Sequence, residues 1–228
     1  GRWESWRVPV APGERCDSAD RYGKIGFTPD GSVWVANRWN AGLMRFRAGA
    51  WERYTDKSGL PSNAARTLAV DQQGRLWLGA GNGLFRWEDG KVAERVVPPD
   101  LPGDTVTALA CAADGSRWVA AGAEDPRRGG VVKLGPAPAH VYTPADSGLP
   151  SARVWDILID RRGNVWFATT DGVARLSPAG VWETFTPLNS GLANPVVYSL
   201  AETADGALWF ATAGGVSRWT PEAGTAAP

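Results

Sequence analysis

The chain repeats one fourteen-residue phrase. It reads GRLWLGAGNGLFRW at 74–87, GNVWFATTDGVARL at 163–176 and GALWFATAGGVSRW at 206–219. Weaker copies contain Trp34 and Trp118, so that a Trp recurs every 41 to 48 residues, each time three residues after a Gly. A period of this length is the signature of a repeat architecture, and it limits the possible folds more than any local preference does.

Each repeat unit is predicted to form four short antiparallel strands. An apolar stretch such as TLAV or DILI precedes a segment such as DQQG or DRRG, whose composition is that of a hairpin turn. The Trp strand follows, a second Gly opens a third strand, and a fourth strand follows in most units. Four strands in one such period are typical of a β-propeller blade. Helical repeats are excluded, because no segment shows sustained helical spacing of apolar residues.

The two ends of the chain predict how the ring closes. After the fifth unit the chain reads TPEAGTAAP and supplies no fourth strand. The N-terminal GRWESWR aligns with GAWERYT at 49–55 and GVWETFT at 180–186, so that Gly1 and Trp3 fall into shared positions. We therefore expect the N-terminal strand to complete the last blade, which leaves no unpaired sheet edge. The predicted fold class is all-β: a five-bladed β-propeller of four-stranded antiparallel blades.

The units also set the expected limits of the domain and its blades. A single propeller is expected over residues 1–219, followed by a C-terminal linker or tail at 220–228. The blades are expected at 22–55, 66–97, 105–143, 153–186, and 196–219 together with 2–8.

Two shared positions predict how the blades pack. The repeated Trp is expected to fill the wedge between neighbouring blades, since a buried indole covers ~150–250 Å². A cation recurs in each third strand, at Arg45, Arg86, Lys133, Arg175 and Arg218. These cations could form a ring for an anion, or each could lie along a Trp or bond to its own blade. We favour the second interpretation, because third strands lie toward the outside of a propeller.

The charge balance argues against some classes of partner. The 228 residues include 24 basic and 24 acidic side chains, so the bulk charge favours neither nucleic acid nor an anionic membrane. No apolar run approaches the ~20 residues of a membrane-spanning helix, and we expect no membrane insertion of this domain. Cys16 and Cys111 are too few for a disulfide scaffold, and Cys111 is expected to be a small buried hydrophobe.

Residue patterns that carry catalysis are scarce. The sequence lacks G-x-S-x-G, H-E-x-x-H, P-loop and paired C-x-x-C motifs. The single histidine, His140, is expected on the surface of an outer strand rather than in a metal site. Asp71 and Asp160 recur at hairpin turns, where capping of the turn explains them. We predict no catalytic residue, no metal and no cofactor, and we favour a protein that is not an enzyme.

The binding face is predicted from the positions at which the units differ, because shared positions build the scaffold and loops over it carry function. The segments 9–22, 35–42 and 119–130 are longer than their counterparts, and propeller topology places them on one face, where the inner strands begin. Mixed aromatic, cationic and hydroxyl side chains there converge on the axis and predict a small-ligand or peptide pocket. The candidate ligand-binding residues are Lys24, Arg38, Trp39, Arg66, Arg153, Trp155, Asp156 and Tyr198.

Two of these aromatic assignments have structural alternatives. Trp155 and Tyr198 could plug the channel of a narrow ring, and Trp39 could lie over a neighbouring blade instead of serving as an exposed anchor beside Arg38.

The unit DRRGNVWFATTDGVARL and the link SGLPSARVWDILID resemble the two-component regulator propeller repeat. The resemblance covers nearly the whole chain. It implies a bacterial propeller of the kind found in the sensor regions of hybrid histidine kinases, with a signalling or effector domain elsewhere in a longer chain. A periplasmic or extracellular location follows if that resemblance holds, and a cytoplasmic one otherwise. The blades are also similar to those of virginiamycin B lyase, whose metal-site chemistry matches no position of this chain.

The leading functional prediction is a non-catalytic, sensor-type recognition propeller that binds a small ligand or a protein or peptide partner. One alternative is a carbohydrate-binding, lectin-like propeller, suggested by the 13 Trp residues and the five-fold ring. A second alternative is a lyase-type propeller enzyme.

Overall fold

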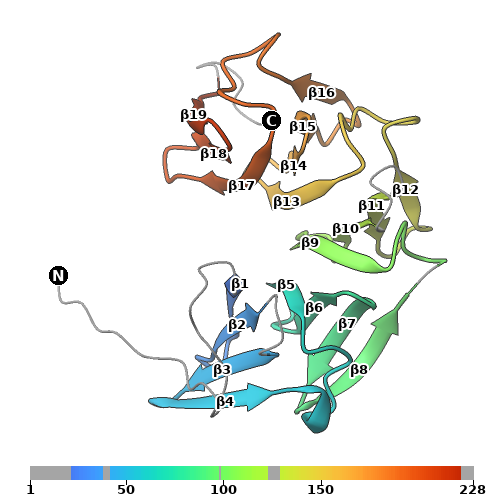
Figure 1. Cartoon of the computed structure of the whole chain (residues 1–228), viewed down its shortest axis with the longest axis vertical. Helices are drawn as coiled ribbons and strands as arrows, with labels where there is room; N and C mark the ends of the chain where they lie inside the picture. The colour runs from blue at the N-terminus through green and yellow to red at the C-terminus, as the bar shows by residue number, and fades with distance from the viewer. Residues whose placement is uncertain (1–21, 38–41, 98, 123–128, 222–228) are drawn as a thin grey trace.

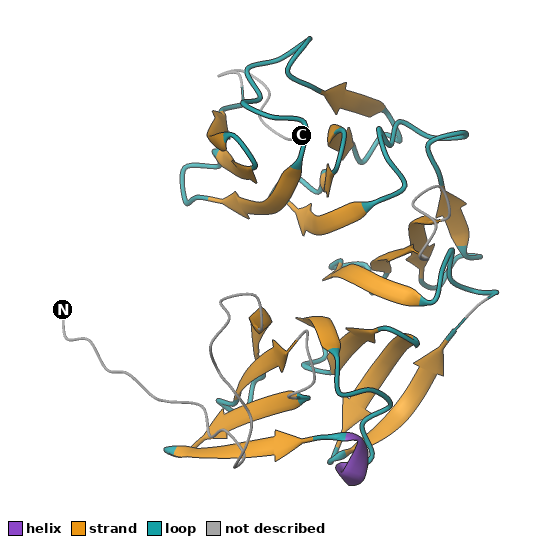
Figure 2. Cartoon of the chain, in the orientation of Figure 1, coloured by secondary structure: helices purple, strands orange, loops and turns teal. Residues whose placement is uncertain are grey.

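The computed structural model describes residues 22–37, 42–97, 99–122 and 129–221. Their strands form five antiparallel blades arranged in a ring, and the one helical element among them is a short 3-10 turn, η2 (Asp56–Ser58). Figure 1 shows the blades following one another around the ring in chain order, and Figure 2 shows how little helix accompanies them. The predicted fold class, a five-bladed all-β propeller, is confirmed.

The strands have the following bounds. Blade 1 contains β1 (Tyr22–Phe27), β2 (Val33–Asn37), β3 (Leu43–Arg47) and β4 (Ala50–Tyr54). Blade 2 contains β5 (Ala65–Val70), β6 (Leu76–Ala80), β7 (Gly83–Glu88) and β8 (Lys91–Val96). Blade 3 contains β9 (Thr105–Cys111), β10 (Arg117–Gly122), β11 (Gly129–Leu134) and β12 (His140–Tyr142). Blade 4 contains β13 (Val154–Ile159), β14 (Val165–Thr169), β15 (Gly172–Leu176) and β16 (Trp182–Phe185). Blade 5 contains β17 (Val197–Glu202), β18 (Leu208–Thr212) and β19 (Gly215–Trp219).

Within each blade the strands pair in chain order, from the first strand at the centre of the ring to the last strand at its rim. The first strands β1, β5, β9, β13 and β17 lie side by side in that order. A fourth strand is described in blades 1 to 4. The strand predicted to complete blade 5, within residues 2–8, lies outside the described residues.

An Asp fixes the hairpin between the first and second strands. In blade 4, Asp160 accepts the backbone N–H of Asn164 at 2.8 Å and the indole N–H of Trp166 at 2.8 Å. Gly163 in the same turn has φ +79°, a left-handed conformation that favours glycine. Asp71 in blade 2 likewise accepts the indole N–H of its own blade, at 3.0 Å. The predicted capping role of these carboxylates is confirmed.

Four apolar clusters join consecutive blades, from blades 1 and 2 to blades 4 and 5. The repeated Trp is buried in the first four blades, where the exposed fractions of Trp34, Trp77, Trp118 and Trp166 are 7%, 0%, 4% and 0%. Between blades 1 and 2 the inner strands approach so closely that a Cβ on Gly26 would lie 2.5 Å from Leu68 Cδ1. The indoles therefore fill the wedges, as predicted for these blades.

The seam between blades 5 and 1 is different. Trp209 and Val216 on blade 5 are 40% and 65% exposed, and Ile25 and Phe27 on blade 1 are 59% and 71% exposed. No apolar cluster of the described residues joins these two blades. The prediction that every repeated Trp fills a wedge is wrong for Trp209 in the described part of the chain, because no described blade packs on that side of it.

Cys111 is also less enclosed than predicted. It lies at the end of β9, half-buried beside the cluster between blades 2 and 3, as a free thiol. Burial raises the pKa of this thiol to about 11. Cys16 lies outside the described residues.

Candidate functional site

An aromatic and cationic cluster lies where blades 4 and 5 meet, on the face where the first strands begin, here called the start face. Trp155 in β13 and Tyr198 in β17 have ring centroids 6.3 Å apart, with their planes inclined at 59°. The guanidinium carbon of Arg153 lies 5.3 Å from the centroid of the Trp155 ring, within cation–π range. Tyr198 is 52% exposed, so this start-face cluster presents an aromatic surface and a positive charge to solvent.

Beside this cluster, Lys24 and Asp156 bind each other. Asp156 is 1% exposed, and its Oδ1 lies 2.7 Å from the Lys24 ammonium. Its Oδ2 accepts the Ser199 hydroxyl and the Leu200 backbone N–H, each at 3.0 Å. Asp156 therefore joins blades 1, 4 and 5 near the centre of the ring, with partners on both of its oxygens. The Lys24 side chain is 42% exposed, which leaves its ammonium partly open to solvent.

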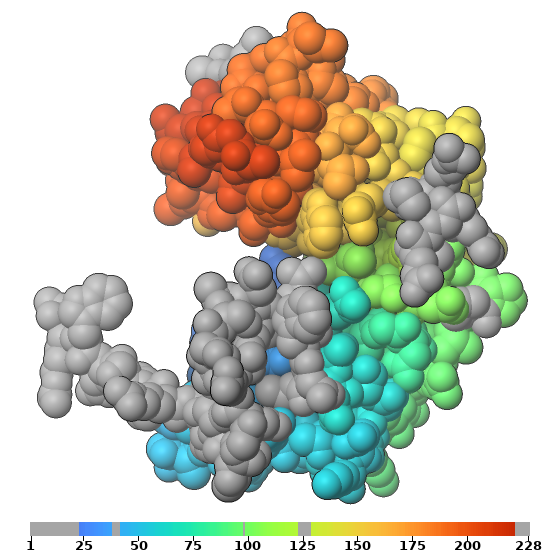
Figure 3. All heavy atoms as spheres, in the orientation of Figure 1, coloured from blue at the N-terminus to red at the C-terminus, as the bar shows by residue number. Residues whose placement is uncertain are grey.

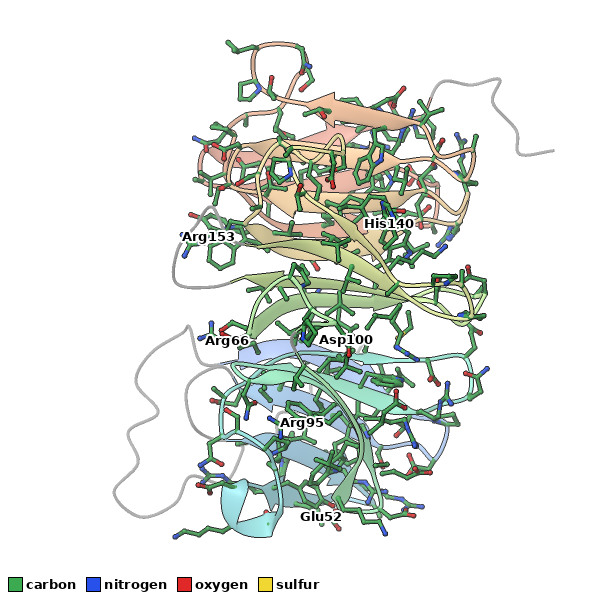
Figure 4. All side chains as sticks on the ribbon, turned by 90° about the vertical axis from the view of Figure 1, so that its right-hand side faces the viewer. Glu52, Arg66, Arg95, Asp100, His140 and Arg153 are labelled. Atoms are coloured by element: carbon green, nitrogen blue, oxygen red, sulfur yellow. The ribbon has the colours of Figure 1, made fainter. Side chains whose placement is uncertain are left out.

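The remaining candidates are placed as follows. Arg66 lies on β5 of blade 2, half-buried, and Figure 4 shows it on the same edge of the molecule as Arg153. Arg38 and Trp39 lie outside the described residues, as do residues 9–21, 38–41 and 123–128 of the three long segments. The structure thus brings together Arg153, Trp155 and Tyr198, pairs Lys24 with Asp156, and places Arg66 on the same face.

The cations of the third strands are held by their own blades. The guanidinium carbon of Arg45 lies 5.3 Å from the Trp34 ring, and that of Arg175 lies 5.6 Å from the Trp166 ring. Each of the five cations also pairs with a carboxylate of its own blade. The interpretation of this position as structural is confirmed, and the five charges do not form a ring for an anion.

Two grooves on the opposite face, here called the turn face, were not predicted from the sequence. One has a volume of about 520 Å³ and lies between blades 1 and 2; the other has a volume of about 560 Å³ and lies between blades 3 and 4. Their walls are built from equivalent positions: Asp30, Trp34, Arg45 and Tyr54 in the first groove, and Asp114, Trp118, Lys133 and Tyr142 in the second.

Side-chain packing explains why these two grooves differ from the other junctions. Between blades 2 and 3 the guanidinium of Arg117 lies over the Trp77 ring, 4.1 Å from its centroid, and occupies the equivalent space. Between blades 4 and 5 the Trp219 ring packs 5.1 Å from that of Trp166. The sequence does contain a feature that distinguishes these two grooves. Tyr54 and Tyr142 are the tyrosines of the described fourth strands, and each lines one of the grooves.

His140 lies exposed on β12, with its ring 4.4 Å from that of Tyr142, as expected for a surface strand residue. In the part of the chain that the structure describes, no group of three or more His, Cys, Asp and Glu side chains is placed to hold a metal ion. Over the same residues, no helix has the length and apolarity needed to span a bilayer.

Known proteins share both the repeat and the fold. The family model described as the two component regulator propeller matches residues 59–82, 148–171 and 191–214. No curated protein sequence matches the chain. The extracellular domain of the putative hybrid two component system BT3049 from B. thetaiotaomicron superposes with a TM-score of 0.74 at 21% identity, covering 88% of this chain and 28% of that one.

Two further solved structures have the same fold. The extracellular domain of BT4673 from B. thetaiotaomicron has a TM-score of 0.69 at 20% identity, covering 89% of this chain and 26% of that one. Virginiamycin B lyase from Staphylococcus aureus has a TM-score of 0.63 at 16% identity, covering 93% of this chain and 74% of that one.

The chain thus spans little more than a quarter of the length of the two extracellular domains, 28% and 26%. At these identities the structural likeness establishes a common fold, and the family model matches three of the repeat segments. The resemblance noted in the sequence is confirmed: this chain is a β-propeller that carries two-component regulator propeller repeats.

Proposed function

We propose that this propeller is a non-catalytic recognition module of the sensor type, which binds a small ligand or a peptide of a partner protein on its start face. The observation that carries the proposal is the start-face cluster, in which Arg153, Trp155 and the half-exposed Tyr198 meet at the junction of blades 4 and 5. Aromatic and Arg side chains are the groups that dominate recognition surfaces.

The chemistry of the cluster indicates what it would bind. Arg153 and the partly exposed ammonium of Lys24 supply positive charge, and the rings of Trp155 and Tyr198 supply apolar surface. A ligand with a carboxylate or another anionic group next to an apolar or aromatic portion would complement both features. The fold likeness to extracellular domains of hybrid two-component systems supports a sensor role for such binding.

The test is a binding measurement with defined probes. Small aromatic carboxylic acids and short acidic peptides are titrated against the full chain, with tryptophan fluorescence and the thermal midpoint Tm as readouts. Arg153→Ala and Tyr198→Ala are expected to weaken binding at least tenfold. Arg95→Ala is the matched control, because Arg95 also lies over an aromatic ring, 5.6 Å from that of Phe85, but on an outer strand. Equal affinities for all three variants would reject the start face as the site.

A second candidate function, carbohydrate binding, is favoured by the two turn-face grooves. Each combines a Tyr, a Trp, a carboxylate and a cation in equivalent positions, and aromatic rings beside paired polar groups suit the apolar and hydroxyl faces of a sugar ring. Glycan-array screening followed by calorimetry tests this function. Two equivalent sites per chain are expected, with one remaining in Tyr142→Ala; absence of glycan binding, or binding unchanged by that substitution, would remove this candidate.

A further inference from the structure

A β-bulge recurs in the first strand of every blade, at its start-face end. In β5, Ala65 pairs with Ala80 and Thr67 pairs with Gly79, so that Arg66 is an extra residue between two paired ones. A shift in register occurs at the equivalent place in the other four first strands. In blades 2 to 5 the extra residues, here called the bulge residues, are Arg66, Thr107, Trp155 and Tyr198.

The repeat contains a feature that accompanies this bulge. In blades 2 to 5 the second-strand residue that pairs just after the bulge is small, and it follows the repeated Trp by two positions: Gly79, Ala120, Ala168 and Ala211. A Cβ on Gly79 would lie 2.6 Å from Thr67 Cγ2 and 2.4 Å from Val106 Cγ1. In blade 2 the bulged strand therefore approaches its partner so closely that no larger side chain fits.

The bulges change which side chains of the first strands reach the surface. Ala65 and Thr67 are 0% and 1% exposed, whereas Arg66 between them is half-buried. Thr107 and Trp155 are likewise half-buried between fully buried neighbours, and Tyr198 is half-exposed. Bulges are common beside functional sites, where they redirect a side chain. Here they present a cation, a hydroxyl group and two aromatic rings on one face.

The bulge residues of neighbouring blades lie next to one another. The Thr107 hydroxyl donates a hydrogen bond to the carbonyl of Val154 at 2.7 Å, directly before Trp155, and the Trp155 ring contacts that of Tyr198. Because β5 packs beside β9, Arg66 lies on the other side of Thr107. Figure 3 shows the teal, green and yellow surfaces of blades 2, 3 and 4 meeting near the centre of this face. The four bulge residues thus form an arc.

The hydrogen-bonding capacity of this arc limits the chemistry of a ligand. Thr107 uses its proton in the bond to Val154, so that its oxygen is left to accept a further hydrogen bond. The guanidinium of Arg66 only donates, and its geometry matches a carboxylate. The rings of Trp155 and Tyr198 supply apolar surface. A ligand that complements the arc therefore carries a carboxylate, a donor N–H group and an aromatic ring, in this order.

We propose that the four bulge residues determine the specificity of the start face, and that its ligand is an aromatic α-amino acid, free or as the C-terminal residue of a peptide. This inference rests on the proposed function of the start face. Arg66 binds the ligand carboxylate, Thr107 accepts the ligand N–H, and the ligand ring packs on Trp155 and Tyr198. The ammonium of a free amino acid and the amide of a peptide both donate to Thr107.

Calorimetry on the full chain tests the three contacts with probes that each lack one group. L-phenylalanine is the reference, L-phenylalaninamide lacks the carboxylate, 3-phenylpropionate lacks the amine, and L-alanine lacks the ring. Each omission is expected to weaken binding at least about tenfold, because each removes a charge-assisted hydrogen bond or a buried ring. The tripeptide Gly-Gly-Phe identifies the source of the ligand: tighter binding than that of L-phenylalanine indicates a peptide C-terminus, and weaker binding indicates the free amino acid.

Two variants connect the probes to the bulge residues. Arg66→Gln is expected to bring the affinities for L-phenylalanine and L-phenylalaninamide within about twofold of each other, because the partner of the carboxylate is removed. Thr107→Val is expected to do the same for L-phenylalanine and 3-phenylpropionate. Arg95→Gln, on the exposed outer strand β8, is the matched control and should keep both preferences. Each readout is a ratio of two affinities on one variant, so partial unfolding does not imitate it.

The result that supports the proposal is the loss of each preference in its own variant alone. Equal binding of L-phenylalanine and its amide, a carboxylate preference that survives Arg66→Gln, or no binding of any probe would overturn it. These failures differ from failure of the proposed function. If Tyr198→Ala weakens binding while Arg66→Gln keeps the preference, the start face stands as the site and the assignment of the carboxylate to Arg66 falls. If neither variant alters binding, the start face itself is rejected.

Discussion

The indole N–H of Trp166 donates a hydrogen bond to Oδ2 of Asp160 at 2.8 Å, and both side chains are buried. The six-residue separation of these two positions places the Asp in a hairpin turn and the Trp in the strand that follows. The carboxylate thereby binds the turn backbone on one side and the wedge indole on the other. The same relationship joins Asp71 to Trp77 at 3.0 Å, whereas in blade 1 the Trp34 indole donates to the hydroxyl of Thr28, which stands at the equivalent position.

Removal of this carboxylate is expected to destabilise the propeller. Asp160→Ala leaves the fully buried indole N–H of Trp166 without its acceptor, a loss of about 1–3 kcal/mol in the free energy of unfolding. Asp160→Asn keeps an acceptor and is expected to cost less. Urea denaturation at pH 7 measures both. The control is Asp114→Ala in blade 3, where the turn Asp binds Ser116. A loss for Asp160→Ala no larger than that of the control would contradict the role assigned to the indole bond.

Acid is expected to weaken the same turns. Burial opposes ionisation of Asp71, but hydrogen bonds from Trp77 and from the backbone and side chain of Arg75 outweigh it and lower the pKa of this carboxyl. The folded-state pKa of Asp71 thus lies below its unfolded value of about 3.9. Above pH 3.9 the ionised carboxylate therefore stabilises the fold in full. This stabilisation is lost as the pH falls through the folded-state pKa. The free-energy difference between the unmodified protein and Asp71→Asn is therefore expected to be largest near pH 7 and to shrink below pH 4. Denaturation curves at several pH values measure it, and a difference independent of pH would refute the linkage.

The repeat allowed most of the fold to be predicted from the sequence, because a Trp and a turn Gly at a fixed period specify the same hairpin five times. The structural role of Arg45 and its equivalents was also predictable, since an outer-strand position already implies contact with the same blade. The repeat could not predict where residues at equivalent positions of two blades have different surroundings. Trp209 has the same sequence context as Trp166, yet its exposure depends on which blade lies beside it.

The candidate site was harder to predict for a related reason. Lys24 and Asp156 were selected as separate ligand groups because each lies near the start of an inner strand. Their mutual ion pair depends on how close blades 1 and 4 approach across the ring, which no local pattern encodes. The turn-face grooves were missed because they depend on packing between blades, where a single Arg117 or Trp219 decides whether the space is filled.

The ion pair of Lys24 and Asp156 leads to an asymmetric prediction. Lys24→Met leaves the Asp156 carboxylate, which is 1% exposed, without its counter-ion, so the loss is expected to approach the about 3–5 kcal/mol typical of a broken buried pair. Asp156→Ala is expected to cost less, about 1–3 kcal/mol, because the remaining Lys24 is 42% exposed and solvated, and the loss comes from the hydrogen bonds of Ser199 and the Leu200 backbone. Urea denaturation of the two variants checks the difference. Equal losses would show that the carboxylate's bonds to blade 5 contribute as much as its ion pair with blade 1.

Cys111 is expected to react slowly with thiol reagents. Burial, with a smaller contribution from the negative charge of Asp71, raises the pKa of its thiol from 9.0 to about 11. Because the thiolate is the reactive form, its fraction at pH 8 is reduced roughly 100-fold relative to an unshifted thiol. Reaction with a chromogenic disulfide at pH 8 is therefore expected to be at least that much slower in the folded protein than in urea. The measurement uses a Cys16→Ser background, so that a single thiol is followed.

The reaction rate of Cys111 in the folded protein should rise about tenfold between pH 8 and pH 9, since the thiolate fraction grows tenfold per pH unit below the pKa. Rapid reaction in the folded state, or a rate that levels off below pH 9, would show that the β9 thiol is more open to water than its place beside the cluster between blades 2 and 3 implies.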